Sequence, residues 1–486
     1  MRGAEAGACG ALPRAPGPEG VVVDLHVEAD SAEGRRAGLE RALRDAVRDG
    51  RLPPGALLPA TRRLAAELGM SRNTVKAAYD QLVAEGYLTA RQGSGTQVAP
   101  LPPAAAEPPE AAARARAPRF DLRPGSPDVG AFPAAAWLRA MRRALAAAPS
   151  PAYDYGDPRG RIELRTALSG YLGRARGVLA PPERIVVTAG YVQGLALLTR
   201  VLGDAPIAME DPGLPFHREV VRHNGGTVTA APVDDDGVRV AELGDAGAVV
   251  VTPAHQYPTG GTLHPGRRRA LTEWARARDG LIVEDDYDGE FRYDRQPVGA
   301  LQGMAPGQVV YLGTASKTLG PALRLGWMVL PPRLVDAVVD AKLHSDHHTE
   351  SLGQLALTEM ITAHAYDRHV RACRLRYRRR RDLLLDRLGA DRRVRGIAAG
   401  LHALVDVADE EEALARAAAE GLAVGRLGEH WHDAAPDGAE RRPQGLVVGY
   451  GTPREGAYPE ALEALARALE GMCSGAPAPE QVPRSR

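Results

Sequence analysis

The sequence predicts two folded parts: a small α+β domain of three helices and a β-hairpin, and a larger α/β domain that ends in a smaller α/β lobe. Two observations indicate this division. Residues 100–118 are rich in Pro and Ala, which is typical of a semi-rigid linker between domains. From Phe120 to Leu325, short apolar strand patterns alternate with helical patterns, as in a parallel sheet covered by helices on both faces. We therefore expect domains over residues 31–99 and 119–473.

The composition narrows the classes of protein that this chain of 486 residues can represent. Lys and Arg number 61 and Asp and Glu number 61, so the net charge does not by itself indicate a nucleic-acid partner. No apolar run reaches the ~18–20 residues that a membrane-spanning helix needs, and the N-terminus lacks the apolar core of a signal peptide. Three distant cysteines without metal-ligand spacing predict free thiols in a reducing cytoplasm and no metal site. We expect residues 1–30 and 474–486 to be flexible tails.

The small domain is predicted from helical periodicity and turn residues. Each of its helical patterns places the apolar residues on one face. Ser71 is a good N-cap for the third helix. Two short strand patterns follow, joined by a turn that contains glycine. The predicted elements are helices over residues 35–51, 61–68 and 72–85 and strands over residues 87–90 and 96–99, the order of a winged helix-turn-helix.

Two stretches of this domain closely resemble the GntR-type DNA-binding domain: P-A-T-R-R-L-A-A-E-L-G-M-S-R-N-T-V-K from Pro59 and E-G-Y-L-T-A-R-Q-G-S-G-T from Glu85. The resemblance implies that the third helix enters the major groove of double-stranded DNA and that the wing lies near the minor groove. A winged helix used for protein contacts is the alternative, and the polar, basic start of the third helix disfavours it. The expected DNA contacts are Arg62, Ser71, Arg72, Asn73, Thr74 and Lys76, with Gln92 and Gly93 in the wing.

Lys317 is the residue around which we expect the site of the large domain. An apolar strand pattern over residues 309–312 precedes it, and Thr314, Ser316 and Arg324 flank it. Hydroxyls, backbone N–H groups and a guanidinium suit a bound phosphate, and an amine beside a phosphate suits a Schiff base with pyridoxal phosphate (PLP). A lone lysine is more often a solvated surface charge, but the chain has only three lysines and the flanking residues favour a site here.

An acidic run follows the preceding predicted strand, residues 281–283. It consists of Glu284, Asp285 and Asp286, and Tyr287 comes directly after it. Ligands of open α/β sheets bind outside the carboxyl ends of the strands. A carboxylate there can keep a pyridine nitrogen protonated, and a tyrosine can hydrogen-bond the ring phenolate. A solvated acidic turn is the alternative, but three acids repel one another, which favours a cationic ligand or counter-charge.

Three further motifs follow predicted strands: T-A-G-Y-V-Q from Thr188, E-D-P-G-L from Glu210 and H-Q-Y-P-T-G from His255. With E-D-D-Y-D and T-A-S-K they resemble fold type I PLP-dependent aminotransferases, and more narrowly the MocR-type regulators, over roughly residues 32–470. The resemblance implies PLP as the cofactor, with Lys317 as the residue that forms the Schiff base. The expected cofactor-binding residues are Gly190, Tyr191, Leu214, Tyr257, Asp285, Tyr287, Thr314, Ser316, Lys317 and Arg324.

The chain departs from the aminotransferase pattern at two positions. Leu214 stands where an aromatic residue usually stacks on the PLP ring, which leaves Phe216 or His217 as substitutes and weakens the case for full catalytic competence. Tyr257 stands where aminotransferases usually have Asn, and MocR-type proteins resemble it in having an aromatic residue there.

The resemblance implies a PLP-dependent transcriptional regulator, a head-to-tail homodimer that binds an operator and senses PLP or a small amine or amino acid. An amino-acid effector would need an arginine for its carboxylate, and Arg441 and Arg442 are candidates. Two alternatives stay open. One is an active aminotransferase with an accessory DNA-binding domain, and the other is a DNA-binding module whose large domain has lost PLP.

Overall fold

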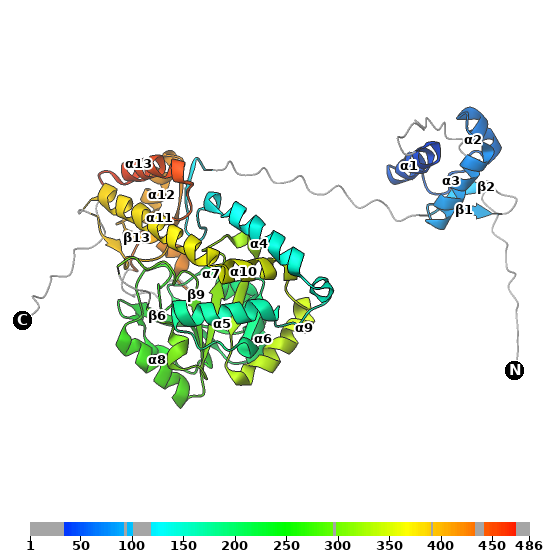
Figure 1. Cartoon of the computed structure of the whole chain (residues 1–486). Coiled ribbons are helices and arrows are strands. Elements are labelled where there is room, and N and C mark those ends of the chain that lie inside the picture. Colours follow the sequence, from blue (N-terminus) through cyan, green and yellow to red (C-terminus); the bar gives the residue numbers. More distant parts are fainter. Residues whose placement is uncertain are drawn as a thin grey trace, which may run out of the picture. The chain divides into compact units, whose positions relative to one another are not determined.

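The computed structural model describes residues 34–91, 95–100, 118–294, 298–389, 392–432 and 442–472. Contacts within the chain divide it into two compact units, residues 1–115 and 116–486 (Figure 1). Each unit has its own hydrophobic core. Within the described ranges, no helix combines the length and the apolar character that crossing a membrane requires.

The small unit consists of three helices and a two-stranded antiparallel sheet in which Leu88 pairs with Val98. Apolar residues recur every three or four positions along its helices, so each helix turns one face inward; on the third, Val75 and Leu82 are buried. The Ser71 hydroxyl accepts the N–H of Thr74 at 3.1 Å and caps that helix. The elements are α1 (Arg35–Arg48), α2 (Thr61–Glu67), α3 (Arg72–Ala84), β1 (Leu88–Arg91) and β2 (Gly95–Val98).

An eight-stranded sheet forms the centre of the large unit, in the order β4-β11-β10-β9-β8-β5-β6-β7. Its middle strands are parallel, and β11 and β7 pair antiparallel to their neighbours. Every residue of β4, β8, β9, β10 and β11 is buried, as expected when helices cover both faces. The strands are β4 (Ile185–Thr188), β5 (Ile207–Asp211), β6 (Val228–Asp234), β7 (Gly237–Val238), β8 (Ala248–Val251), β9 (Leu281–Asp286), β10 (Val309–Thr314) and β11 (Gly326–Val329).

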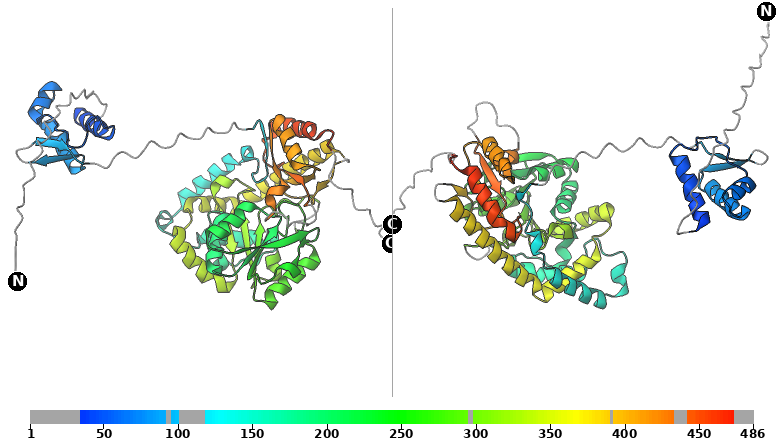
Figure 2. Two further views of the ribbon diagram at one scale, coloured as in Figure 1. Left: turned by 180° about the vertical axis from the view of Figure 1, so that it is seen from behind. Right: turned by 90° about the horizontal axis from the view of Figure 1, so that it is seen from above.

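Helices cover the two faces of this sheet (Figures 1 and 2). Alternate strand residues face opposite sides of the sheet, and a group of helices covers each side: Val186 packs on the first side and Val187 on the second. The first group is α6 (Tyr191–Leu202), α7 (Pro215–His223) and α9 (Val335–Asp346). The second group is α5 (Ile162–Arg176), α8 (Pro265–Ala277) and α10 (Ser351–Thr362), with α4 (Ala134–Ala147) packed on α10.

A smaller α/β lobe completes the large unit. Its five-stranded sheet has the order β12-β13-β15-β14-β3. Strand β3 comes from the start of the unit and pairs parallel with β14, so the chain enters through the lobe before it builds the large sheet. The elements are β3 (Phe120–Leu122), α11 (Ala365–Leu388), β12 (Val394–Arg395), β13 (Ala403–Asp406), α12 (Glu410–Ala419), β14 (Leu422–Arg426), β15 (Gly445–Val448) and α13 (Tyr458–Leu469).

This architecture confirms the predicted fold class: a small helical unit with a hairpin, an α/β domain and an α/β lobe. Two strands continue further than their apolar patterns indicate, β9 through Asp286 and β10 through Thr314. Polar residues can occupy these buried strand ends because other groups of the protein form hydrogen bonds with them. Glu284, for example, accepts the backbone N–H groups of Leu301 and Gln302 at 2.7 and 2.9 Å.

Candidate functional site

The large unit holds a cavity of about 290 Å³ at the carboxyl ends of its parallel strands. The segments that follow β4, β5, β8, β9 and β10 contribute to it, as expected for a ligand site of an open α/β sheet. Gly190 is the one residue of the predicted cofactor set that is not part of the cavity wall. The wall includes the predicted residues Tyr191, Leu214, Tyr257, Asp285, Tyr287, Thr314, Ser316, Lys317 and Arg324.

Lys317 lies in the loop that follows β10, and its amine points across the cavity wall to another segment. The ammonium donates a hydrogen bond to the carbonyl of Gly125, near the start of the large unit. Burial lowers the pKa of the Lys317 amine, and the carboxylates of Asp285 and Asp288 oppose that shift. A lowered pKa increases the fraction of neutral, nucleophilic amine near neutral pH, which suits attachment to a carbonyl compound.

Strand β9 sorts the acidic run onto the two sides of the sheet, because side chains alternate along a strand. Glu284 accepts two backbone N–H groups, and Asp286 accepts the buried guanidinium of Arg176 at 2.6 Å. Protein groups therefore bind both of these acids, although burial and the charge of Asp286 still raise the pKa of Glu284 to about 7. Asp285 is the member of the three that lines the cavity. Burial raises the pKa of its carboxyl well above the usual value, and the positive charge of Lys317 opposes that shift.

Another part of the wall suits an anion. Arg324 has a left-handed backbone (φ 51°) and donates to the carbonyl of Ala189. Gly190 has φ 93°, a backbone conformation that favours glycine, and a Cβ there would lie only 3.0 Å from the Arg324 guanidinium. The Thr314 hydroxyl donates to that of Ser316 at 2.9 Å. Helix α6 begins beside these groups, and its first N–H groups add to the donors available to a phosphate.

Two tyrosine hydroxyls of the wall are held by histidines. Burial lowers the pKa of His430, and its Nδ1 donates to a backbone carbonyl, so Nε2 accepts the hydroxyl of Tyr257 at 3.2 Å. The Tyr287 hydroxyl donates to the carbonyl of His255 at 3.0 Å. His255 in turn donates from Nδ1 to Asp288 at 2.8 Å. Because His430 belongs to the lobe, Tyr257 links the lobe to the large sheet.

The face that an aromatic residue usually covers is built differently here. Phe216 is 53% exposed and lies outside the cavity, whereas His217 lines it together with Leu214. The ring of His217 lies 4.4 Å from that of Tyr191, at an interplanar angle of 33°. Burial and the charge of Lys317 lower the pKa of His217 to about 3, so its ring is neutral. Tyr191, Leu214 and His217 therefore form an uncharged part of the cavity wall.

Several cavity residues were not predicted. The buried Arg218 donates to three backbone carbonyls, at 2.9, 3.0 and 3.0 Å, two of them in the lobe. Glu210 accepts the hydroxyl of Thr252 at 2.5 Å, and burial raises the pKa of Glu210 to about 7. Its place at the end of a predicted strand is a signal that could have identified it. Pro124–Ser126 and His402 come from distant segments, and no local pattern marks Pro124–Ser126.

The side chains around Lys317 have the chemistry that PLP requires. A carboxyl (Asp285) can pair with the pyridine nitrogen, and a guanidinium (Arg324) with hydroxyls and helix N–H groups can hold the phosphate. Neither arginine suggested for an effector carboxylate joins this set among the described residues. Arg441 lies outside those residues, and Arg442, whose guanidinium lies 5.0 Å from the ring centre of Trp431, is not part of the cavity wall.

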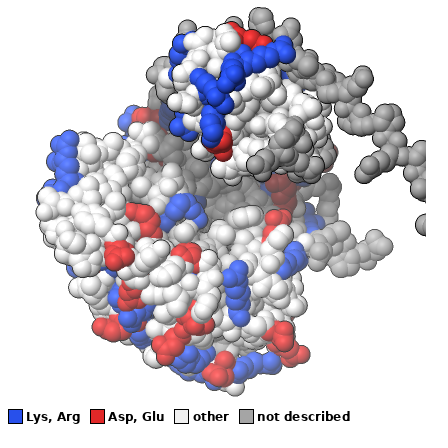
Figure 3. All heavy atoms as spheres, turned by 90° about the vertical axis from the view of Figure 1, so that its right-hand side faces the viewer, with Lys and Arg blue, Asp and Glu red and all other residues white. Residues whose placement is uncertain are grey.

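The residues predicted to contact DNA surround the starts of α2 and α3 in the small unit. Arg62, Arg72 and Asn73 are exposed, and Figure 3 shows Lys and Arg side chains gathered over this unit. Such a surface suits the phosphate backbone of a nucleic acid. Gln92 and Gly93 lie outside the described residues.

Three other predicted DNA contacts also have partners within the small unit. The hydroxyls of Ser71 and Thr74 hydrogen-bond each other at 2.8 Å, and Ser71 caps α3. Lys76 forms an exposed ion pair with Asp80 at 2.5 Å. Exposed pairs of this kind are weak, so a phosphate group can compete for the lysine.

Two family profiles match the chain. Residues 120–428 match "Aminotransferase class I and II", and residues 36–98 match "Bacterial regulatory proteins, gntR family". The HTH-type pyridoxine biosynthesis transcriptional regulator PdxR of Corynebacterium glutamicum is 35% identical over 425 residues, which cover 85% of this chain and 91% of that protein. The probable rhizopine catabolism regulatory protein MocR of Rhizobium meliloti is 33% identical over 460 residues, which cover 88% and 92%.

Solved aminotransferase structures resemble the large unit. The kynurenine aminotransferase of Pyrococcus horikoshii, solved with PMP, matches 72% of this chain and 90% of its own with a TM-score of 0.65 and 25% identity. An aspartate aminotransferase mutant of Thermus thermophilus matches 72% and 96% with a TM-score of 0.62 and 27% identity. The aminotransferase family implies PLP dependence. The chain therefore belongs to the MocR-type, GntR-family transcriptional regulators, in which a helix-turn-helix domain is joined to a fold type I aminotransferase-like domain.

Proposed function

We propose that this regulator carries PLP on Lys317 and that PLP itself, rather than an amino acid, is the effector that alters its affinity for an operator. The use of arginine in the cavity wall is the observation that carries the proposal. Among the described residues, Arg218 and Arg324 are the arginines of that wall. Arg324 stands against Gly190, where it suits a phosphate, whereas Arg218 donates to three backbone carbonyls.

An amino-acid effector needs a cation for its carboxylate, and the histidines of the wall are poor candidates. Burial lowers the pKa of His217 to about 3 and that of His402 well below the usual value. Both rings are therefore neutral at physiological pH. Within the described part of the wall, the charge pattern favours a ligand with a single anionic group, and PLP, with its phosphate, is such a ligand.

The residues of the predicted cofactor set would contact different parts of PLP. When bound, PLP would supply an electrophilic carbonyl and a ring that acts as an electron sink. Lys317 would hold the carbonyl carbon, and Asp285 would keep the ring nitrogen protonated. Leu214 and His217 would cover the ring, and the hydroxyls of Tyr257 and Tyr287 would lie beside its phenolate oxygen. The phosphate is assigned to Gly190, Tyr191, Thr314, Ser316 and Arg324.

A homodimer is part of the proposal. Large apolar side chains in and after α4 are exposed: Leu138 by 51%, Tyr153 by 59%, Tyr155 by 79% and Ile162 by 51%. Exposed apolar surface of this kind often marks a protein interface. A head-to-tail dimer would present two winged helices, which suits an operator with two half-sites.

The relatives' names support a PLP-related ligand. The C. glutamicum relative is named for pyridoxine biosynthesis, and pyridoxine is chemically related to PLP. The R. meliloti relative is named for rhizopine catabolism, so effectors of this family need not be the same.

The test is a titration of operator DNA, selected from genomic fragments, with the purified full-length chain. The titration is repeated with PLP, with pyridoxal, and with PLP plus each amino acid. We expect PLP to change the apparent Kd by about 5- to 150-fold, the usual range for an allosteric coupling, and amino acids to add nothing. An amino acid that shifts the affinity further at saturating PLP would contradict the choice of effector. Transamination without operator binding would support the enzyme alternative instead.

A further inference from the structure

Lys342, on α9, is a charged side chain that is completely buried, with 0% of its surface exposed. A buried ammonium is costly unless it is fully paired. The Lys342 amine donates to both carboxylate oxygens of Asp346 at 2.8 Å each and to the hydroxyl of Thr349 at 2.9 Å. These three bonds use the donors that a lysine has. The buried lysine and its partners therefore form a fully hydrogen-bonded polar cluster, at whose outer edge the Asp346 side chain is 28% exposed.

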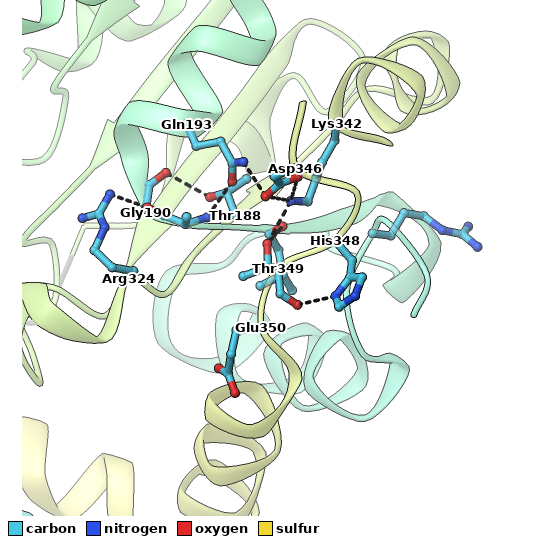
Figure 4. A network of polar contacts seen from close by, with 12 residues as sticks. Thr188, Gly190, Gln193, Arg324, Lys342, Asp346, His348, Thr349 and Glu350 are labelled. Carbon is cyan, nitrogen blue, oxygen red and sulfur yellow. Dashed lines mark hydrogen bonds and ion pairs between the residues drawn. The ribbon is translucent and has the colours of Figure 1, made fainter. Parts of the chain in front are cut away.

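This cluster is tied to both sides of the turn between β4 and α6 (Figure 4). On the strand side, the Thr349 hydroxyl donates to the carbonyl of Val187 at 3.1 Å. On the helix side, Asp346 accepts Nε2–H of Gln193 at 2.6 Å. Gln193 in turn accepts the backbone N–H of Ala189 through Oε1 at 2.7 Å. Hydrogen bonds thus run without a break from Lys342 to the turn.

The turn that this cluster holds is the one that meets Arg324. Ala189 uses its N–H for Gln193 and its carbonyl for the Arg324 guanidinium. The hydroxyl of Thr188 donates to the carbonyl of Gly190 at 3.1 Å. With these groups engaged, the turn has little freedom. The start of α6 and the Arg324 guanidinium are therefore fixed relative to each other.

We propose that Lys342, Asp346 and Gln193 are positioning residues for a phosphate ligand. None of the three is part of the cavity wall, but together they hold the β4–α6 turn in the geometry that phosphate requires. The inference rests on the proposed function, which assigns the phosphate of PLP to Arg324 and this turn. Stability alone does not require the ion pair, because apolar side chains of similar volume often replace buried pairs without loss. A positioning role predicts a defect that depends on the phosphate.

The experiment compares two ligands that differ only in the phosphate, PLP and pyridoxal, on the purified full-length chain. The variants are Gln193→Met and Lys342→Met, which keep approximate side-chain length and remove the polar groups. Affinities come from the absorbance of the bound ligand, and ³¹P NMR of bound PLP reports on the surroundings of its phosphate. We expect both variants to weaken PLP by about ten-fold or more, as happens at metal sites when the hydrogen-bond partners of the ligands are removed, and to shift the ³¹P signal. The affinity for pyridoxal should stay nearly unchanged.

Asp406→Asn is the matched control. It removes a buried carboxylate that pairs with Arg393 and Arg395 in the lobe, outside the cavity wall. This variant should lower the melting temperature and leave the ratio of PLP to pyridoxal affinity unchanged. If Gln193→Met, which does not disturb a buried charge of its own, lost both ligands equally or neither, the positioning role would be wrong. A parent chain that bound neither ligand would instead overturn the proposed function, so the two failures are distinguishable.

Discussion

Burial disfavours the charged forms of both Lys317 and Asp285. It lowers the pKa of the amine and raises that of the carboxyl, so in both residues it favours the uncharged form. Each charge partly opposes the shift of the other. A ligand that brings a carbonyl group to the amine and a basic ring nitrogen to the carboxyl suits both residues, which is the physical basis for assigning PLP to this cavity.

Lys317→Ala should abolish covalent attachment of PLP, because neither of the other two lysines of the chain is part of the cavity wall. Lys342 is buried against Asp346, and Lys76 belongs to the small unit. The measurement is borohydride reduction of the loaded chain followed by mass spectrometry of its peptides. A reduced adduct on Lys76 or Lys342 of the parent chain would refute the assignment.

The pH dependence of attachment should reflect the lowered pKa of Lys317. Attachment needs the neutral amine, and a lysine whose pKa is lowered becomes neutral at a lower pH than the ordinary value of 10.5. The attachment rate should therefore rise with pH and reach half of its maximum below pH 10.5, as followed by stopped-flow absorbance. N-acetyl-lysine methylamide, with an ordinary side-chain amine, is the control. A midpoint for the protein at or above that of the control would contradict the expectation.

Arg324→Ala should weaken PLP through the loss of the phosphate contact. Charge-assisted hydrogen bonds contribute ~1.5–3 kcal/mol, which corresponds to roughly ten-fold to more than a hundred-fold in Kd. Equilibrium titration with PLP and with pyridoxal measures the effect. The role would have to be abandoned if the affinities for the two ligands fell by the same factor.

In helix α3, one residue both caps the helix and is predicted to contact DNA. Ser71 caps the helix through the N–H of Thr74, and the same position is predicted to face DNA. Arg72 is exposed beside it. Any loss of DNA binding in a Ser71 variant therefore has two possible origins, whereas Arg72 is suited to test the DNA contact by itself.

Ser71→Ala should destabilise α3 by about 1 kcal/mol, because the N–H of Thr74 loses its side-chain acceptor. Arg72→Ala should leave the helix intact and weaken operator binding by ~1–3 kcal/mol if it contacts a base. Hydrogen–deuterium exchange of the α3 amides and operator titration of the full chain separate the two effects. Equal exchange in the two variants would show that the cap is not needed.

Elements of the fold were predictable where their pattern is local. The winged helix, the strands before Gly190 and Lys317, and the cavity at the strand ends follow from periodicity and motif order. The full length of β9 does not, because Glu284 stays buried only by accepting N–H groups of a segment that follows later in the chain. Likewise, Pro124–Ser126 reaches the cavity because β3 pairs with β14, a contact between the two ends of the large unit that no local pattern marks.

Functional residues were likewise predictable where a local pattern marks them. Alternation along β9 is enough to separate Asp285 from its two acidic neighbours, although only the structure shows which side faces the cavity. The sequence does not reveal that Arg218 is occupied by backbone carbonyls, since that depends on the position of the lobe. The burial of Lys342 is equally hidden, because its partners Asp346 and Thr349 look like ordinary surface residues in the sequence.

The whole molecule joins two compact units, each with its own core. Separate cores mean that a substitution in one unit need not unfold the other. Reading of DNA and binding of PLP can therefore be disabled one at a time. Joining a DNA-binding domain to a ligand-binding domain allows PLP on Lys317 to change how the two winged helices of a dimer are placed on their half-sites. A ligand shifts DNA binding only if it has different affinities for the dimer arrangements that bind DNA well and poorly.

The most direct measurement of this claim is an operator titration of the parent chain, Arg72→Ala and Lys317→Ala, each with and without PLP. We expect Arg72→Ala to lose most of its specific operator affinity while it retains the absorbance of bound PLP. Lys317→Ala should keep basal operator affinity and lose the change that PLP produces in the parent. A Lys317→Ala chain that still responds to PLP as the parent does would show that PLP does not act through Lys317.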